Sequence, residues 1–235
     1  MTKLWPAIVL IAIFLPLVLL LGSAHAWIFS SSVYERHYGS GIYGSFLEQG
    51  YDRQAINDIT SELLSFLGTR SHAALDTPPD FFGEDEVAHF TDVRAHMLNG
   101  KNFLRISILF LLLAVALLFV LSYMEMKTYW VSYGFKYLGM ALTISSIAML
   151  LFGGIAFVAF ENFSSTFYYF HVLFFPQGNF AFSQDTNMIQ LFPQYFFQQM
   201  GERIMITSAA AAIFALICGV LLSRSGPLWQ EHSSV

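Results

Sequence analysis

The sequence predicts an all-α integral membrane protein with four transmembrane helices and a mostly helical extracellular cap made from two outer segments. Two observations lead to this fold class. Of the 235 residues, 56% are hydrophobic and 11% are charged, whereas a soluble domain of this size is about one quarter charged. The apolar residues also collect into four runs, each close to the roughly 20 residues that a helix needs to cross a bilayer.

The four predicted helices cover about residues 4–29, 104–124, 137–160 and 204–223. None contains Asp, Glu, Lys or Arg in its body, and the apolar run of the second begins at Ile106, just after Arg105. The first run also resembles a secretory signal, because Lys3 precedes it and Ala24-His25-Ala26 follows it. It is long for a signal peptide, so we expect residues 1–26 to remain as an uncleaved helix.

Four spans place both termini on the same side of the membrane. The short connections carry Lys3, Lys127, Lys136 and Arg224, and basic residues in short connections favour the cytoplasmic side. The longer segments, about 30–103 and 161–203, would then face outward and form the cap. We expect all 235 residues to form a single membrane domain.

Within the cap, spacing predicts two helices. Residues 54–67 place apolar side chains on one face and end before Gly68. Residues 84–98 begin with three acids, which suit the first turn of a helix. The later segment is predicted to be loop-like around residues 176–179, and residues 189–200 are short, aromatic and interrupted by proline.

Several function classes are disfavoured by composition. The chain has no basic patch of the kind that binds nucleic acid. Its one cysteine, Cys218, allows no intrachain disulfide and lies in an apolar run. There is no serine elbow, HExxH or glycine-rich phosphate loop, and the spans lack the buried charges of pumps and channels. Among the kinds of site considered, only one based on histidines in the outer segments remains.

The densest polar cluster is His89, Asp92 and His96, which share one helix face at positions i, i+3 and i+7. Three interpretations stay open. Asp92 could orient the His89 ring for acid–base catalysis, the three could begin a metal site, or they could be an ordinary solvated face.

His171 lies among aromatic residues just after the third apolar run. It could be a simple interfacial side chain like the neighbouring tyrosines. Alternatively, apolar neighbours would disfavour its charged form, so that a neutral ring could accept a proton at pH 7.

Three stretches together resemble the lipoprotein intramolecular transacylase family. They are EVAHFTDVR (86–94), FHVLFFPQGNF (170–180) and MIQLFPQYFF (188–197). The resemblance covers the whole topology, and it implies a four-span bacterial membrane protein with its site on the outer face of the cytoplasmic membrane.

The family moves the sn-2 acyl chain of a lipoprotein's diacylglyceryl-cysteine to the α-amino group of that cysteine, giving the lyso-form. The resemblance implies that His89 and His171 are the catalytic pair, supported by Asp92, Arg94 and Asp185. Aromatic residues nearby would bind the acyl chains: Tyr169, Phe170, Phe174, Phe175 and Phe180.

This interpretation needs no cofactor and no metal, and its partners are a diacylated lipoprotein and membrane lipid. Two other functions stay open. One is a metal-dependent membrane hydrolase that uses His89, Asp92 and His96. The other is a non-enzymatic lipid-binding protein, in which neither histidine would matter for function.

Overall fold

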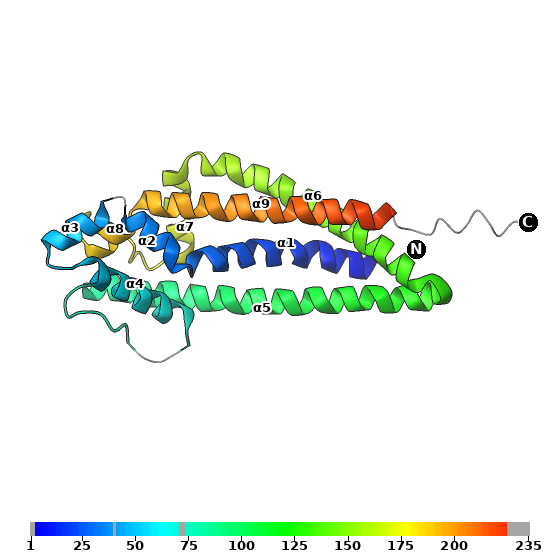
Figure 1. Ribbon diagram of the computed structural model, residues 1–235, viewed down its shortest axis with the longest axis horizontal. Helices are drawn as coiled ribbons and strands as arrows, with labels where there is room; N and C mark the ends of the chain where they lie inside the picture. Colours follow the sequence, from blue (N-terminus) through cyan, green and yellow to red (C-terminus); the bar gives the residue numbers. More distant parts are fainter. Residues whose placement is uncertain (1–2, 40, 71–73, 225–235) are drawn as a thin grey trace, which may run out of the picture. The chain divides into compact units, whose positions relative to one another are not determined.

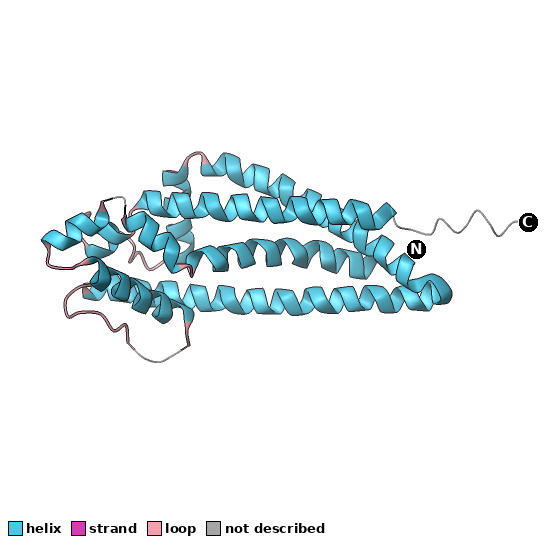
Figure 2. Ribbon diagram, viewed as in Figure 1, coloured by secondary structure: helices cyan, strands magenta, loops and turns pink. Residues whose placement is uncertain are grey.

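The computed structural model describes residues 3–39, 41–70 and 74–224, and these form helices and loops without any strand (Figure 2). In chain order the elements are α1 Trp5–Ile28, α2 Ser31–Tyr38, α3 Ile42–Glu48, α4 Arg53–Gly68, α5 Glu84–Met126, the 3₁₀ turn η1 Lys127–Tyr129, α6 Trp130–Phe160, α7 Phe163–Phe174, α8 Asn187–Leu191 and α9 Gln194–Arg224.

These elements fall into two compact units. Unit 1 comprises Met1–Ser23, Phe103–Phe157 and Met205–Val235, and unit 2 comprises Ala24–Asn102 and Val158–Ile204. The boundaries of unit 2 lie close to those of the two predicted outer segments. Whether this unit faces the outside of a membrane remains a prediction.

Unit 1 is a bundle of long apolar helices (Figure 1). Its buried core joins the start of α1 to the last third of α5 and the first half of α6, through residues such as Ile8, Leu118 and Ala141. Glycines let α6 and α9 approach closely. A Cβ on Gly139 would lie 2.6 Å from the backbone oxygen of Gly219, so a larger residue has no room there.

By length and hydropathy, three helical stretches of the described chain are candidates to cross a membrane: Trp5–Ile28, Glu84–Phe160 and Gln194–Arg224. The middle stretch has 77 residues and contains both α5 and α6, between which the chain reverses at η1 (Figure 1). The second and third predicted spans both lie within it, and the count of four separate spans stays a prediction.

Unit 2 is built from short helices around an aromatic core. Tyr38, Phe46 and Phe81 are among its fully buried side chains. The helix α4 starts where predicted, because the Asp52 carboxylate accepts a hydrogen bond from the backbone of Ala55 (2.8 Å). It ends at Gly68, as the sequence indicated.

The start of α5 is anchored by Glu86, which is buried at 6% exposure. Its carboxylate accepts hydrogen bonds from the backbone of Gly83 and of Met188, both at 2.7 Å. The first bond closes the helix end in the manner of a capping box. The second ties α5 to α8, so the turn that carries His89 has a fixed position in unit 2.

Three segments differ from the sequence-based expectation. The predicted helices 84–98 and 104–124 are one continuous 43-residue helix, α5, because the polar residues between them are tolerated in a helix and Gly100 costs only about 1 kcal/mol. The aromatic segment after the third apolar run forms α7. Pro193 lies between α8 and α9, so α9 begins earlier than the predicted fourth span.

Candidate active site

The two histidines singled out from the sequence lie together in unit 2. His89 is in the second turn of α5, and His171 is in the last turn of α7. Their ring centroids are 6.2 Å apart and the ring planes differ by 18°. Residues separated by about eighty positions are therefore close enough to act on one small group.

Both rings line a cavity of about 660 Å³, which we call the histidine pocket. Phenylalanine is the most frequent residue of its wall, with twelve members: Phe90, Phe160, Phe163, Phe167, Phe170, Phe174, Phe175, Phe180, Phe182, Phe192, Phe196 and Phe197. Phe175 is 3% exposed and contacts both histidines, with centroid distances of 4.7 Å to His89 and 5.5 Å to His171. The volume falls in the range of about 300–1,000 Å³ that is usual for small-molecule sites.

The tautomer of His171 follows from its hydrogen bond. Its Nδ1 lies 2.7 Å from the backbone oxygen of Phe167, one turn earlier in α7. A carbonyl oxygen only accepts, so Nδ1 carries the proton and donates it. In the neutral ring, Nε2 is then the nitrogen with a free lone pair. The helix therefore presents His171 as a proton acceptor at Nε2.

His89 has a drier environment. The side chain is 7% exposed, and its Nδ1 is buried without a hydrogen-bond partner in the described part of the chain. Burial and, second, the nearby His171 lower the pKa of His89 to about 4, against weaker raising effects of the Asn179 backbone and the Asp92 carboxylate. At pH 7 this ring is neutral.

Asp92 holds a loop rather than the His89 ring. Its Oδ2 accepts hydrogen bonds from the side-chain amides of Gln177 (2.8 Å) and Asn179 (2.6 Å). Both amides belong to the turn after α7, where Gly178 adopts the left-handed φ of 81°. The carboxylate therefore links α5 to this turn, and the turn continues into Phe180 and Phe182 of the pocket wall.

His96 and Arg94 also brace the site from α5. The Nε2 of His96 donates to the backbone oxygen of Phe174 (2.9 Å), one of the carbonyls left unpaired at the end of α7. Arg94 donates two hydrogen bonds to the backbone oxygen of Thr69, at 3.2 and 2.9 Å, after α4. His96 lines the pocket and Arg94 does not.

Of the remaining predicted site residues, some line the histidine pocket and others do not. Phe170, Phe174, Phe175 and Phe180 line the histidine pocket, whereas Tyr169 is 69% exposed and does not. Asp185 is exposed and its neighbour Gln184 lines the pocket instead. A role for Tyr169 or Asp185 in the site stays a prediction.

Sequence reasoning missed the two amides that hold Asp92. Gln177 and Asn179 were interpreted only as loop residues, since no motif marks an amide that binds a carboxylate. The available signal was their place in a Pro-Gln-Gly-Asn turn five residues after His171. Such a turn fixes the direction of the side chains on either side of its glycine.

The metal interpretation receives no support from the geometry. In residues 3–39, 41–70 and 74–224, no three histidine, cysteine or acidic side chains are grouped to hold a metal ion. Asp92 binds two amides and His96 binds a carbonyl, so the shared helix face does not converge on one point. His89, Asp92 and His96 are therefore not a ligand set here.

Comparisons with known proteins identify the family of the chain and a similar fold. The family model described as lipoprotein intramolecular transacylase Lit matches residues 9–197. A solved structure of the membrane integral lipoprotein intramolecular transacylase Lit from Bacillus cereus is similar, with a TM-score of 0.70, 16% identity, and coverage of 94% of this chain and 96% of that one.

Two further structures of the Bacillus cereus protein, with one histidine exchanged for arginine or for alanine, also match. Each has a TM-score of 0.70 and 15% identity over 94% of this chain, covering 92% and 94% of those chains. A search of curated proteins finds no match. The structural likeness concerns the fold, and the family model covers well over half of the sequence.

Proposed function

The chain belongs to the lipoprotein intramolecular transacylase family and is therefore an acyltransferase, and we propose that it converts diacylated bacterial lipoproteins to the lyso-form. In this reaction the sn-2 acyl chain of the diacylglyceryl-cysteine moves to the α-amino group of the same cysteine. The observation that carries the proposal is the pair of imidazoles, His89 and His171, 6.2 Å apart in one apolar pocket.

The proposed chemistry is a balanced transfer within one molecule. The neutral amine attacks the ester carbonyl, so a carbon–nitrogen bond forms and the nitrogen gives up a proton. The bond between the carbonyl carbon and the glyceryl oxygen then breaks, and that oxygen takes up a proton. Water is not consumed, and no enzyme nucleophile is required, which agrees with the lack of a serine elbow or an activated cysteine in the sequence.

His171 is proposed to be the base. Its Nδ1–H is engaged by the Phe167 carbonyl, so Nε2 can accept the proton of the attacking amine. An α-amino group has an unperturbed pKa of about 8, so transfer to an imidazole is feasible near neutral pH. The same ring can return the proton to the glyceryl oxygen as it leaves.

His89 is proposed to assist as a neutral donor. Because burial keeps its pKa at about 4, the ring would be a neutral imidazole at pH 7. Its single N–H would then pass from the Asn179 backbone to the substrate carbonyl. A preorganised N–H close to the carbonyl oxygen stabilises the negative charge that develops there, especially where water is excluded. This division of work between the two histidines refines a simple acid–base pair.

The phenylalanine wall has two proposed roles. It would bury acyl chains, at about 0.8 kcal/mol for each buried CH₂, and hold the ester beside the amine, where proximity supplies much of the rate. It would also keep water from diverting the acyl group to hydrolysis. The half-exposed Phe170 and Phe174 in the pocket lining, and the buried Phe175 in contact with both histidines, support these roles.

We further propose a membrane-integral chain with both termini in the cytoplasm and unit 2 on the outer face. The long apolar helices and the basic residues of the short connections support this topology. Unit 2 would then lie on the side of the membrane on which lipoproteins carry their lipid-modified cysteine.

The test is the lipid state of lipoproteins in cells that express the protein. We expect mass spectrometry of the N-terminal peptides to reveal N-acyl, mono-O-acyl species, and these should vanish in His89→Ala and His171→Ala cells with equal protein levels. Only the diacyl form in wild-type cells would refute the function. Wild-type levels of product in either variant would remove that histidine from the mechanism.

A further inference from the structure

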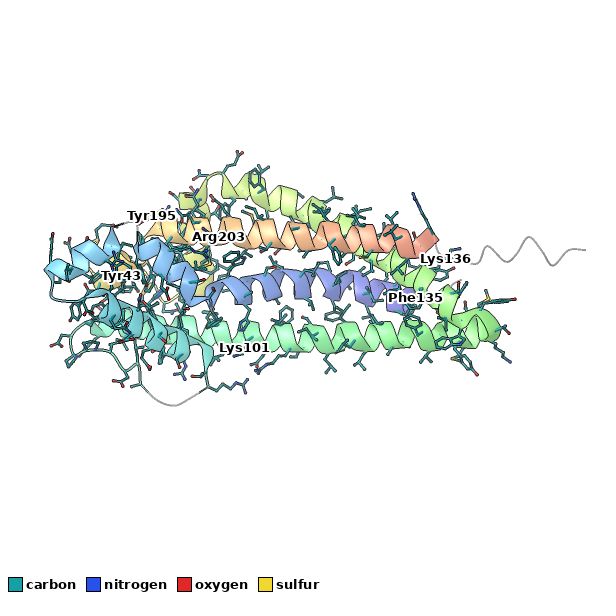
Figure 3. All side chains as sticks on the ribbon, in the orientation of Figure 1. Tyr43, Lys101, Phe135, Lys136, Tyr195 and Arg203 are labelled. Carbon is teal, nitrogen blue, oxygen red and sulfur yellow. The ribbon has the colours of Figure 1, made fainter. Side chains whose placement is uncertain are left out.

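Unit 2 contains a second pocket, which we call the arginine pocket. It holds about 130 Å³ and lies between α2 and α9. Arg36 and His37 line it from α2, and Tyr195, Gln199 and Arg203 line it from α9. Figure 3 labels Tyr195 and Arg203 on the first part of α9.

The pocket combines an apolar floor with a basic rim. Phe196 is 4% exposed and Met200 is 6% exposed, whereas Arg36 lies at the exposed edge. The described lining residues include no aspartate or glutamate. Burial lowers the pKa of His37, so the guanidinium groups of Arg36 and Arg203 supply the positive charge. Two planar guanidinium groups around a small pocket are well suited to a phosphate group.

The position of Arg203 along its helix corresponds to a membrane surface. It directly precedes the apolar run of the predicted fourth span, 204–223. Its guanidinium lies 5.3 Å from the ring centroid of Trp27, which is near the end of the first apolar run. Tryptophan and arginine gather at the depth of lipid headgroups. A phosphate at this depth is one that membrane lipids carry.

We propose that the arginine pocket binds the phosphate of an anionic ligand, with a phospholipid headgroup as the source that its position favours and free phosphate as the other source. This site is separate from the histidine pocket and does not depend on the proposed acyl transfer. The two pockets share Phe196 and Met200 as a common wall, so a bound headgroup would contact the back of the acyl-binding wall.

Binding is tested on the purified full chain in neutral detergent micelles. Dihexanoyl phosphatidylglycerol, zwitterionic dihexanoyl phosphatidylcholine and inorganic phosphate are each titrated, and the shift in melting temperature gives an apparent Kd. Both lipids carry an anionic phosphate, but the choline cation of phosphatidylcholine would be repelled by the two guanidinium groups that line the pocket. We therefore expect phosphatidylglycerol to bind at least roughly tenfold more tightly, a difference of about 1.4 kcal/mol.

Arg36→Gln should weaken binding of the anionic lipid by roughly tenfold, as expected for the loss of one charged hydrogen-bonding group. Its side chain is exposed, so the fold should tolerate the change. Arg53→Gln is the matched control, since Arg53 also lies on unit 2 but packs over Tyr43 outside the pocket. Arg203→Lys keeps the charge without the planar fork and should give an intermediate loss.

The results of these titrations distinguish a phospholipid headgroup from free phosphate as the ligand. Tight binding of the lipid but not of inorganic phosphate, lost in Arg36→Gln, supports a headgroup site. Equal binding of both, lost in the same variant, supports the site with free phosphate as its ligand. Equal affinity for the two lipids with no phosphate binding, or wild-type affinity in Arg36→Gln, would overturn the proposal.

Discussion

Replacing His89 by glutamine should change how the stability of the protein responds to acid. His89 is neutral in the folded chain because burial lowers its pKa from 6.5 to about 4. In the unfolded chain the ring is in water and regains its ordinary pKa. Between pH 6.5 and pH 4 the unfolded state therefore binds a proton that the folded state does not, and the folded state loses stability as the pH falls.

The size of this effect follows from the shift itself. One pKa unit corresponds to 1.36 kcal/mol, so titration of His89 removes about 3 kcal/mol of unfolding free energy between pH 6.5 and pH 4. For a chain of this size, that is a decrease in Tm on the order of 6–12 °C. His89→Gln carries no titratable group and should lack this part of the decrease.

The assay is a series of melting curves in detergent at several pH values, for wild type, His89→Gln and His89→Phe. Other groups titrate equally in all three, so the difference in slope isolates His89. In both variants, Tm should fall less steeply than in wild type as the pH is lowered from 6.5 to 4. Parallel slopes in the three proteins would show that the ring is well hydrated and would refute its proposed role as a neutral donor.

Three further changes test the site. His171→Asn can still donate to the Phe167 carbonyl but has no imidazole base, so activity should fall about 10²–10⁴-fold with little change in Tm; near-normal activity would exclude His171 as the base. Asp92→Asn loses a charged acceptor worth roughly 1–3 kcal/mol, so amides of residues 175–182 should exchange hydrogen faster, and unchanged exchange would contradict the proposed tether. Phe175→Ala removes a buried ring and should cost about 3–5 kcal/mol of stability; a Tm equal to that of wild type would show that the pocket wall is not packed.

Much of the helical layout could be predicted from the sequence, because a long apolar run without charges has few alternatives to a helix. The start of α5 was also readable, since the acids at 84–86 suit the first turn of a helix, whereas the N-cap Asp52 that fixes the start of α4 was recognised only in the structure. The continuity of α5 through residues 98–104 could not be predicted in this way. A polar stretch always ends an apolar pattern, but the helix can either end there or continue. Only the packing around the stretch decides between these two possibilities.

The site shows a similar division. The residue types and the family resemblance picked out His89 and His171, but their 6.2 Å separation depends on how α5 and α7 pack in unit 2. The role of Asp92 could not be read from helix spacing, because the amides that bind it lie about 85 residues away. Helix periodicity predicts which side chains are neighbours on one helix. It carries no information on which loop will donate hydrogen bonds to a carboxylate on that helix.

The most direct test of the central claim is a crossover experiment with purified protein. Two synthetic diacyl lipopeptides are mixed, one with an isotope label in its peptide and the other with a label in its sn-2 acyl chain. We expect N-acyl lyso products in which each peptide keeps its own acyl chain, formed about 10²–10⁴-fold more slowly by His171→Asn. Products that carry both labels or neither, or a release of free fatty acid in place of the amide, would contradict transfer within one molecule in a dry two-histidine pocket.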